Sequence, residues 1–235
     1  MRSIHMSSNS SGGNGVEIWL SAILKLGKML SSENPPTTEL KVETKRKLTA
    51  GEIKMSRLIF QDSIDYSKIW IHVAGYLHRK TGNAMTPAGE IYLPKEDYLN
   101  NKDFSVSPPH LKHWFMHEMT HVWQYQLGAS VGWLGLKQLC KGGYTKSVNS
   151  ADSGASELLA YDTDILNRDQ NKKFSDLNFE QQGRVVEFYF DGMYLKEERP
   201  ERAHHQKSLK MLLEVQAIIM DLIIDPTDKM LLPKA

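Results

Sequence analysis

Apolar residues recur at helical spacing in several parts of the chain and alternate, as in strands, in others. Thr49 followed three residues later by Glu52 forms a capping box, which predicts a helix of about three turns. Pro108-Pro109 and Gly128 bracket another helix, because proline suits a first helical turn and glycine ends helices. Further helices are expected around 155–166, 178–194 and 208–224, and strands at 68–77 and 90–93.

The first 40 residues differ in pattern from the rest. Residues 1–15 are small and polar, which is typical of flexible segments, and 16–31 have the apolar spacing of a short amphipathic helix. Pro35-Pro36 then interrupts the pattern. We therefore predict a flexible N-terminal segment with a short amphipathic helix over 1–40, followed by one domain over 41–235. Strands and helices together predict an α+β fold.

Composition and charge narrow the function classes. The 29 basic and 28 acidic residues create no field that would attract nucleic acid, so no nucleic-acid partner is expected. The single cysteine, Cys140, excludes an internal disulfide and zinc-finger ligand sets. No stretch reaches the roughly 18 apolar residues of a membrane span. Charged residues interrupt the apolar stretch near the N-terminus, which argues against a signal peptide.

The stretch HWFMHEMTHVWQYQ, over 113–126, carries the candidate chemistry. His117 and His121 are four residues apart, so on a helix they share a face and can each give one nitrogen to a zinc ion. Glu118 points about 100° away, where a carboxylate can act as general base toward zinc-activated water. Trp114 and Trp123 mark a core helix, in which buried polar side chains need compensation that a metal provides. Histidines without a metal are the simpler alternative.

A catalytic zinc site needs a third protein ligand. The metzincin pattern would place glycine and histidine where this chain has Gln124 and Leu127, so that class is excluded. An acidic residue from a later helix is then expected. Glu157 and Glu180 both qualify, and spacing alone does not choose between them.

The chain resembles a group of bacterial zinc peptidase-like proteins with an H-E-x-x-H-V-W-Q core, associated with Rhs or Vgr proteins and type VI secretion. The resemblance covers roughly Leu48 to Asp191 and rests on four blocks in order: LTAGEIKMSRLIFQDSIDYSKIWIH, AMTPAGEIYLP, FMHEMTHVWQYQLG and FEQQGRVVEFYF. It favours Glu180 as third ligand, because the E-Q-Q block is a feature of the group and Glu157 is not. Gly183 stands where the group has alanine, which should weaken the helix slightly without moving the ligand.

The resemblance implies a gluzincin-type site in a zincin-like fold: a small twisted sheet, the HExxH helix and a mainly helical C-terminal half. In such folds the strand before the metal helix borders the cleft and pairs with an extended substrate, and GEIYLP is the candidate here. A hydrogen-bond donor for the oxyanion is also expected. The adjacent pair of histidines is expected to be exposed, and four side chains stay open as donors: Tyr161, Tyr189, His204 and His205.

The leading hypothesis is a Zn²⁺-dependent metallopeptidase in which His117, His121 and Glu180 hold the metal and Glu118 activates water. The substrate would be a protein or the peptide part of the cell wall. The resemblance implies a type VI-linked antibacterial effector, made in the bacterial cytoplasm without a signal peptide and delivered into a target cell, with a Vgr or Rhs carrier and an immunity protein as partners. The alternative is a non-catalytic zincin-fold binding or adaptor module with a structural zinc. Hydrolysis of a non-peptide amide would use the same residues.

Overall fold

The computed structural model describes residues 44–73, 84–140, 144, 147–149 and 156–234. The chain divides into two compact units, Met1–Lys41 and Val42–Ala235, and only the second contains described residues. The flexible segment and amphipathic helix predicted over 1–40 lie outside them. Residues 74–77, the end of the strand predicted at 68–77, also lie outside the described residues.

The described part of the chain is α+β and mostly helical, as predicted. A three-stranded sheet has the order β1-β2-β3: β1 (Lys45–Lys47) is antiparallel to β2 (Trp70–Val73), which is parallel to β3 (Ile91–Leu93). A second pair of strands is antiparallel, β4 (Ser147–Asn149) with β5 (Ser156–Leu158). The helices in chain order are α2 (Ala50–Phe60), α3 (Lys95–Asn100), α4 (Pro109–Leu127), α5 (Val131–Cys140), α6 (Phe179–Tyr194), α7 (Ala203–Lys210) and α8 (Leu212–Ile224).

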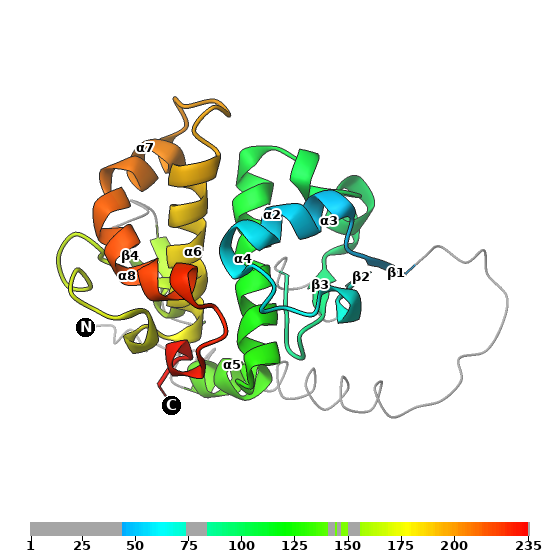
Figure 1. The fold of residues 1–235 in the computed structure, drawn as a ribbon, viewed down its shortest axis with the longest axis horizontal. Helices are drawn as coiled ribbons and strands as arrows, with labels where there is room; N and C mark the ends of the chain where they lie inside the picture. Colours follow the sequence, from blue (N-terminus) through cyan, green and yellow to red (C-terminus); the bar gives the residue numbers. More distant parts are fainter. Residues whose placement is uncertain (1–43, 74–83, 141–143, 145–146, 150–155, 235) are drawn as a thin grey trace, which may run out of the picture. The chain divides into compact units, whose positions relative to one another are not determined.

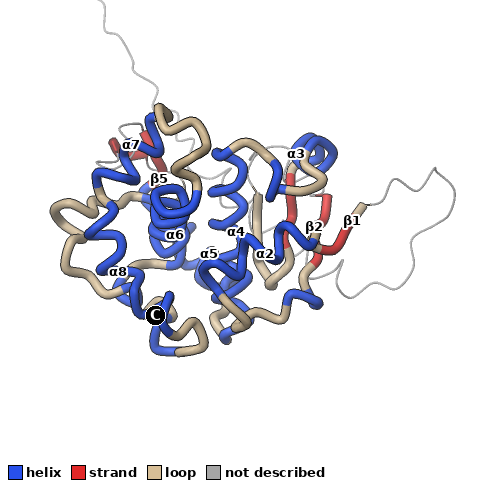
Figure 2. The backbone as a smooth tube through the Cα atoms, turned by 45° about the horizontal axis from the view of Figure 1, so that its top comes forward, coloured by secondary structure: helices blue, strands red, loops and turns tan. Residues whose placement is uncertain are grey.

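Helices α4 and α6 lie side by side at the centre of this unit (Figure 1). Helices α7 and α8 pack on α6, whereas α2 and the sheet lie on the side of α4 (Figure 2). On α4 the side chains of Phe115, Met119 and Trp123 are buried, and on α6 those of Val185 and Phe188 are. The two helices that carry the sequence motifs therefore form the core of the unit.

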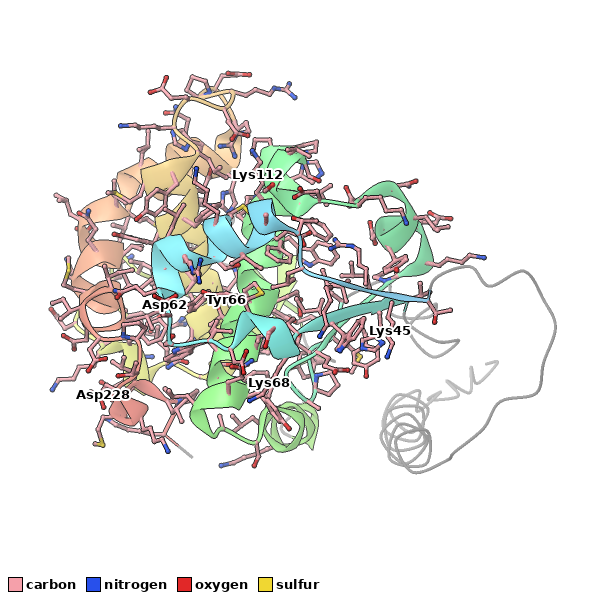
Figure 3. The ribbon with its side chains drawn as sticks, turned by 45° about the vertical axis from the view of Figure 1, so that its right-hand side comes forward. Lys45, Asp62, Tyr66, Lys68, Lys112 and Asp228 are labelled. Atoms are coloured by element: carbon pink, nitrogen blue, oxygen red, sulfur yellow. The ribbon has the colours of Figure 1, made fainter. Side chains whose placement is uncertain are left out.

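Local signals explain where these helices begin and end. Thr49 and Glu52 form the predicted capping box, with hydrogen bonds of 3.1 and 2.9 Å between each side chain and the other residue's backbone N–H. Helix α4 has proline in its first turn and ends at Gly128, whose φ of +114° is the left-handed conformation that glycine adopts readily. At the other end of α4, Lys112 bonds to Glu198, which follows α6 (Figure 3).

Two predicted helices differ from the structure. Within the helix predicted around 155–166, the structure has β5 and a 3-10 turn over Leu159–Tyr161, because pairing with β4 overrides the weak helix preference of the leucines and alanines there. The helix expected over 208–224 is two helices, since α7 ends at Lys210 and α8 starts at Leu212. None of the described helices is long and apolar enough to cross a membrane.

Candidate metal centre

Three predicted ligands meet at the interface between α4 and α6. His117 and His121 lie one turn apart on α4, and their Nε2 atoms are 2.9 and 3.1 Å from the same oxygen, Oε2 of Glu180. All three side chains are buried, and the two imidazole rings cross at 78°. Ligands that bind one ion at about 2.0–2.2 Å lie roughly 3.3 Å apart, which is close to this spacing.

The start of α6 fixes the position of Glu180. The side chain of Asn178 caps the helix and accepts hydrogen bonds of 2.9 Å from the backbone N–H groups of Glu180 and Gln181. The side chain of Gln181 in turn accepts a bond of 3.0 Å from the Asn178 N–H. Glu180 is thus the second residue of a well-capped helix, where the helix dipole favours a carboxylate.

The other ring nitrogen of each histidine is anchored. Nδ1 of His117 lies 2.7 Å from Oε1 of Glu187, and Nδ1 of His121 lies 2.9 Å from Oε1 of Gln124. The amide of Gln124 is itself fixed, because its nitrogen donates to the Phe179 carbonyl and to Oε1 of Gln182. Both Nε2 atoms thus face Glu180. Nδ1 of His121 is hydrogen-bonded to Gln124, whereas the close contact of His117 Nδ1 with Glu187 is an ion-pair distance without hydrogen-bond geometry. A carboxylate or amide oxygen beside Nδ1 is typical of metal-bound histidines.

These donors fit a cation. When both rings carry their proton on Nδ1, two lone pairs face a carboxylate oxygen, and a proton or a metal ion between them relieves the repulsion. Burial by itself would lower the pKa of His117, but hydrogen bonds to Glu180 and Glu187 raise it to about 10. Burial would raise the pKa of Glu180, yet the charge of His121 and the hydrogen bond from His117 hold it well below its usual range. A set of two imidazoles and one carboxylate suits zinc.

Glu118 is buried next to this triad but is not part of the cluster of ligand atoms. Its Oε2 accepts a hydrogen bond of 2.7 Å from Oγ1 of Thr86, which is also buried. Thr86 follows Met85, whose backbone N–H and carbonyl pair with Tyr92 of β3 at 3.0 and 2.9 Å. The carboxylate is therefore oriented by a residue from the sheet side of the molecule.

Two tyrosines lie at the same site. The hydroxyl of Tyr144 donates to Oε1 of Glu180 at 2.5 Å, and the ring of Tyr161 lies 5.7 Å from that of His117. Burial raises the pKa of both phenols far above the usual value, and the negative charge of Glu180 adds to the shift. Both hydroxyls therefore stay protonated and can donate hydrogen bonds.

Gly183, a small residue three positions after Glu180, lies where α6 packs against α4. A Cβ at this position would lie 2.6 Å from Cε1 of His117, closer than real contacts allow. The missing side chain lets the imidazole lie directly against the backbone of α6, which is a packing reason for glycine in a helix interior.

Several other predictions are corrected by the structure. Glu157 lies in strand β5 and not early in a helix, and its side chain is outside the described part. The histidine pair is not exposed: His205 is buried and His204 is largely buried, and both contact Asp191 instead of the metal ligands. Tyr189 packs against Tyr194. Of the four oxyanion candidates, only Tyr161 is at the site.

The strand GEIYLP is also not a free edge. Its residue Tyr92 pairs with β2 on one side and with Met85 on the other. On that side of β3 the neighbouring residue is therefore Met85, which precedes Thr86, the residue bonded to Glu118.

Sequence reasoning missed Glu187, Thr86 and Tyr144. A signal existed for Glu187, because it follows Glu180 by seven residues and so lies on the same face of α6. Thr86 and Tyr144 lie outside helices and strands, and their positions depend on how the chain folds back on α4.

Comparison with models of known protein families finds no match. The chain is 31% identical over 187 residues to the type VI secretion system spike protein VgrG2b of Pseudomonas aeruginosa, an alignment that covers 79% of this chain and 16% of that protein. The chain thus spans about a sixth of its relative. The solved effector domain of VgrG2b matches with a TM-score of 0.56 and 27% identity, over 88% of this chain and 99% of that domain. This homology to an effector domain links the chain to type VI secretion.

Proposed function

We propose that this chain is a zinc-dependent metallopeptidase of the gluzincin type with a zincin-like fold. His117, His121 and Glu180 hold Zn²⁺, and Glu118 is the general base. The observation that carries the proposal is the convergence of two imidazole nitrogens on one buried carboxylate oxygen, at 2.9 and 3.1 Å, next to a second buried carboxylate. A purely structural zinc site has no need of that second carboxylate.

The side chains have separate tasks in peptide hydrolysis. Zn²⁺, when bound, supplies Lewis acidity that makes water more acidic and polarises a peptide carbonyl. Glu118 takes the proton of the attacking water and passes it to the leaving amine. Because Thr86 donates to Oε2 of Glu118, the other carboxylate oxygen receives the proton. Tyr161 is a protonated donor that can stabilise the oxyanion, whereas the hydroxyl of Tyr144 donates to Glu180 and orients that ligand.

The substrate is proposed to bind as an extended peptide along residues 84–86. The backbone of Met85 bonds inward to Tyr92. In an extended segment the neighbouring backbone groups, those of Ala84 and Thr86, then point the other way. An added strand could pair with them, which would bring a peptide bond next to Glu118.

The type VI link supports a role as an antibacterial effector. The matched region of VgrG2b is an effector domain of a spike protein. By analogy, we propose that this chain is made in the bacterial cytoplasm and delivered into a target cell by a Vgr-type carrier. There it would cut a protein or the peptide part of the cell wall, and an immunity protein would protect the producer.

Expression of the full chain in a target bacterium tests this proposal. The wild type should be toxic in either the cytoplasm or the periplasm, with about one zinc per purified chain, as expected for a single three-ligand site. Glu118→Gln should keep the zinc and lose the toxicity. Glu201→Gln, the same change at an exposed carboxylate, should behave as wild type.

Two outcomes would contradict the proposal. A folded wild type that binds no zinc would remove the metal site. Equal toxicity of Glu118→Gln, together with loss of toxicity in His121→Gln, would indicate a zinc-dependent binding module without catalysis.

A further inference from the structure

A second cluster of potential ligands lies one helical turn from the first. His113 of α4, Glu187 of α6 and His204 of α7 each offer one ligand atom within 4.8 Å of the others. We propose that these three side chains form a second, weaker site for a divalent transition metal such as Zn²⁺. The site goes beyond the proposed peptidase activity and does not depend on it.

Two ring nitrogens in this cluster have no hydrogen-bond partner. Nδ1 of His113 and Nε2 of His204 are buried and unpaired among the described residues. A buried polar atom without a partner loses its hydration without compensation, so native proteins normally satisfy such atoms. Oε2 of Glu187 lies 3.8 Å from Nδ1 of His113, which is too far for a hydrogen bond.

The environment of His204 is that of a metal ligand. Its Nδ1 lies 2.6 Å from Oδ2 of Asp191, a fully buried carboxylate that also pairs with Arg202. A carboxylate on one nitrogen fixes the ring and leaves the other nitrogen as a lone-pair donor. His204 Nε2 is that other nitrogen.

Along the interface between α4 and α6, histidines of one helix repeatedly lie opposite carboxylates of the other. Histidines occur at every fourth position of α4 (113, 117 and 121), and carboxylates lie opposite them on α6 at 180 and 187. Glu180 lies between the second and third histidines, and Glu187 lies near the first and second. His204 supplies from α7 the imidazole that completes the second set.

Two features make the second site weaker than the first. The rings of His113 and His204 are stacked within 5° of parallel, with centroids 4.1 Å apart, so one ring must rotate before both lone pairs reach one ion. Oε2 of Glu187 also receives a hydrogen bond of 2.8 Å from Nη1 of Arg184, whose charge opposes a second cation. Because 12% and 25% of the His113 and His204 side chains are exposed, the cluster lies near the surface, although the two unpaired nitrogens are themselves buried.

Titration of the full-length, chelator-treated protein with Co²⁺ or Zn²⁺ alone tests the proposal. Visible absorption and calorimetry should resolve a tight step and a second step at least about tenfold weaker. His204→Gln should abolish the second step and leave the first within about twofold. His121→Gln should do the reverse, which separates this site from the peptidase site. His110→Gln removes an exposed histidine of the same helix and should change neither step.

Because His204 also contacts Asp191, His113→Gln is the second variant, and circular dichroism confirms that each variant is folded. Saturation of the wild type after one metal ion would overturn the proposal. So would a second step that survives in both His204→Gln and His113→Gln. Loss of the second step in either folded variant, with His110→Gln unchanged, supports it.

Discussion

The interface between α4 and α6 holds two histidine–carboxylate clusters that differ in their internal order. In the first, the rings of His117 and His121 cross at 78° and both Nε2 atoms face one oxygen. In the second, the rings of His113 and His204 are nearly parallel and two of their nitrogens are unpaired. The first cluster is organised for a cation before the cation arrives, whereas the second must rearrange.

The two clusters also differ in the pKa of their histidines, as His117 and His113 show. His117 is hydrogen-bonded by two carboxylates, which outweigh burial and raise its pKa to about 10. His113, one turn away, lacks such a bond, so burial outweighs the charge of Glu187 and lowers its pKa to about 4. The four-residue spacing of the histidines shows only that they share one face of α4. The carboxylates on α6 decide which of these histidines is in an environment that attracts a cation.

The largest expected effect is on zinc affinity, and it distinguishes Glu180 from Glu157, the two third-ligand candidates that spacing did not separate. Glu180→Gln removes the charged oxygen that both imidazoles face, so zinc affinity should fall by more than the roughly 100-fold seen for changes around the ligands. Glu157→Gln should change it by less than about threefold. Equilibrium titration against a chelator of known affinity measures both. The opposite order would move the third ligand to Glu157.

The pH dependence of stability should have opposite signs for the two clusters in the metal-free protein. The folded pKa of His113 is about 4 and its unfolded value about 6.5, so between these pH values the unfolded chain binds more protons. Stability from this residue is therefore lost as pH falls from about 6.5 to about 4, by roughly 3 kcal/mol in total. For His117 the folded pKa is raised to about 10, so its contribution is present below about 6.5 and is lost as pH rises toward 10.

Urea unfolding of the wild type and His113→Gln at pH 7.5 and 4.5 tests the sign. The other titrating groups are common to both proteins and cancel in the difference. The variant should lose less free energy of unfolding on acidification than the wild type. Parallel losses would show that His113 is not held neutral.

Glu187 belongs to both clusters, and its replacement should affect them unequally. Glu187→Gln keeps a side-chain oxygen near His117 but removes the charge that anchors Nδ1. We expect zinc affinity at the first site to fall by about 10- to 100-fold, the usual cost of losing such a partner. At the second site Glu187 is itself a proposed ligand, so the weak step should disappear. Equal weakening of both steps would contradict this division of roles.

The sequence predicts the parts of this site that depend on local geometry. The spacing of His117 and His121 and the proline and glycine at the ends of α4 each act within one helix, and the structure has them as expected. The helix expected over 178–194 is found as α6. Spacing left Glu157 and Glu180 as alternative third ligands, and only the family resemblance favoured Glu180. Its position opposite the histidines requires α6 to pack on α4, which no local pattern specifies.

Non-local pairing accounts for what the sequence could not predict. Residues 155–166 have helix-forming composition, but part of them pairs with β4, so local preference yields to the sheet. His204 and His205 were expected to be exposed because they are adjacent in the sequence. Both instead contact Asp191 of α6, a partner that adjacency in the sequence does not reveal. Thr86 reaches Glu118 only because Met85 pairs with β3.

The smallest expected effect concerns the hydrogen bond from Thr86 to Glu118, the proposed general base beside the first cluster. Thr86→Val preserves the shape of the side chain but removes the 2.7 Å bond to Oε2 of Glu118. Hydrogen bonds to charged groups contribute about 1.5–3 kcal/mol, and the lower end of that range corresponds to a fall in activity of about tenfold. Zinc content should be unchanged, because Thr86 contacts no ligand. Thr86→Ser, which keeps the hydroxyl, should restore activity. The measurement is the expression level that halves growth of a target bacterium, and equal toxicity of the valine and serine variants would remove Thr86 as the residue that positions Glu118.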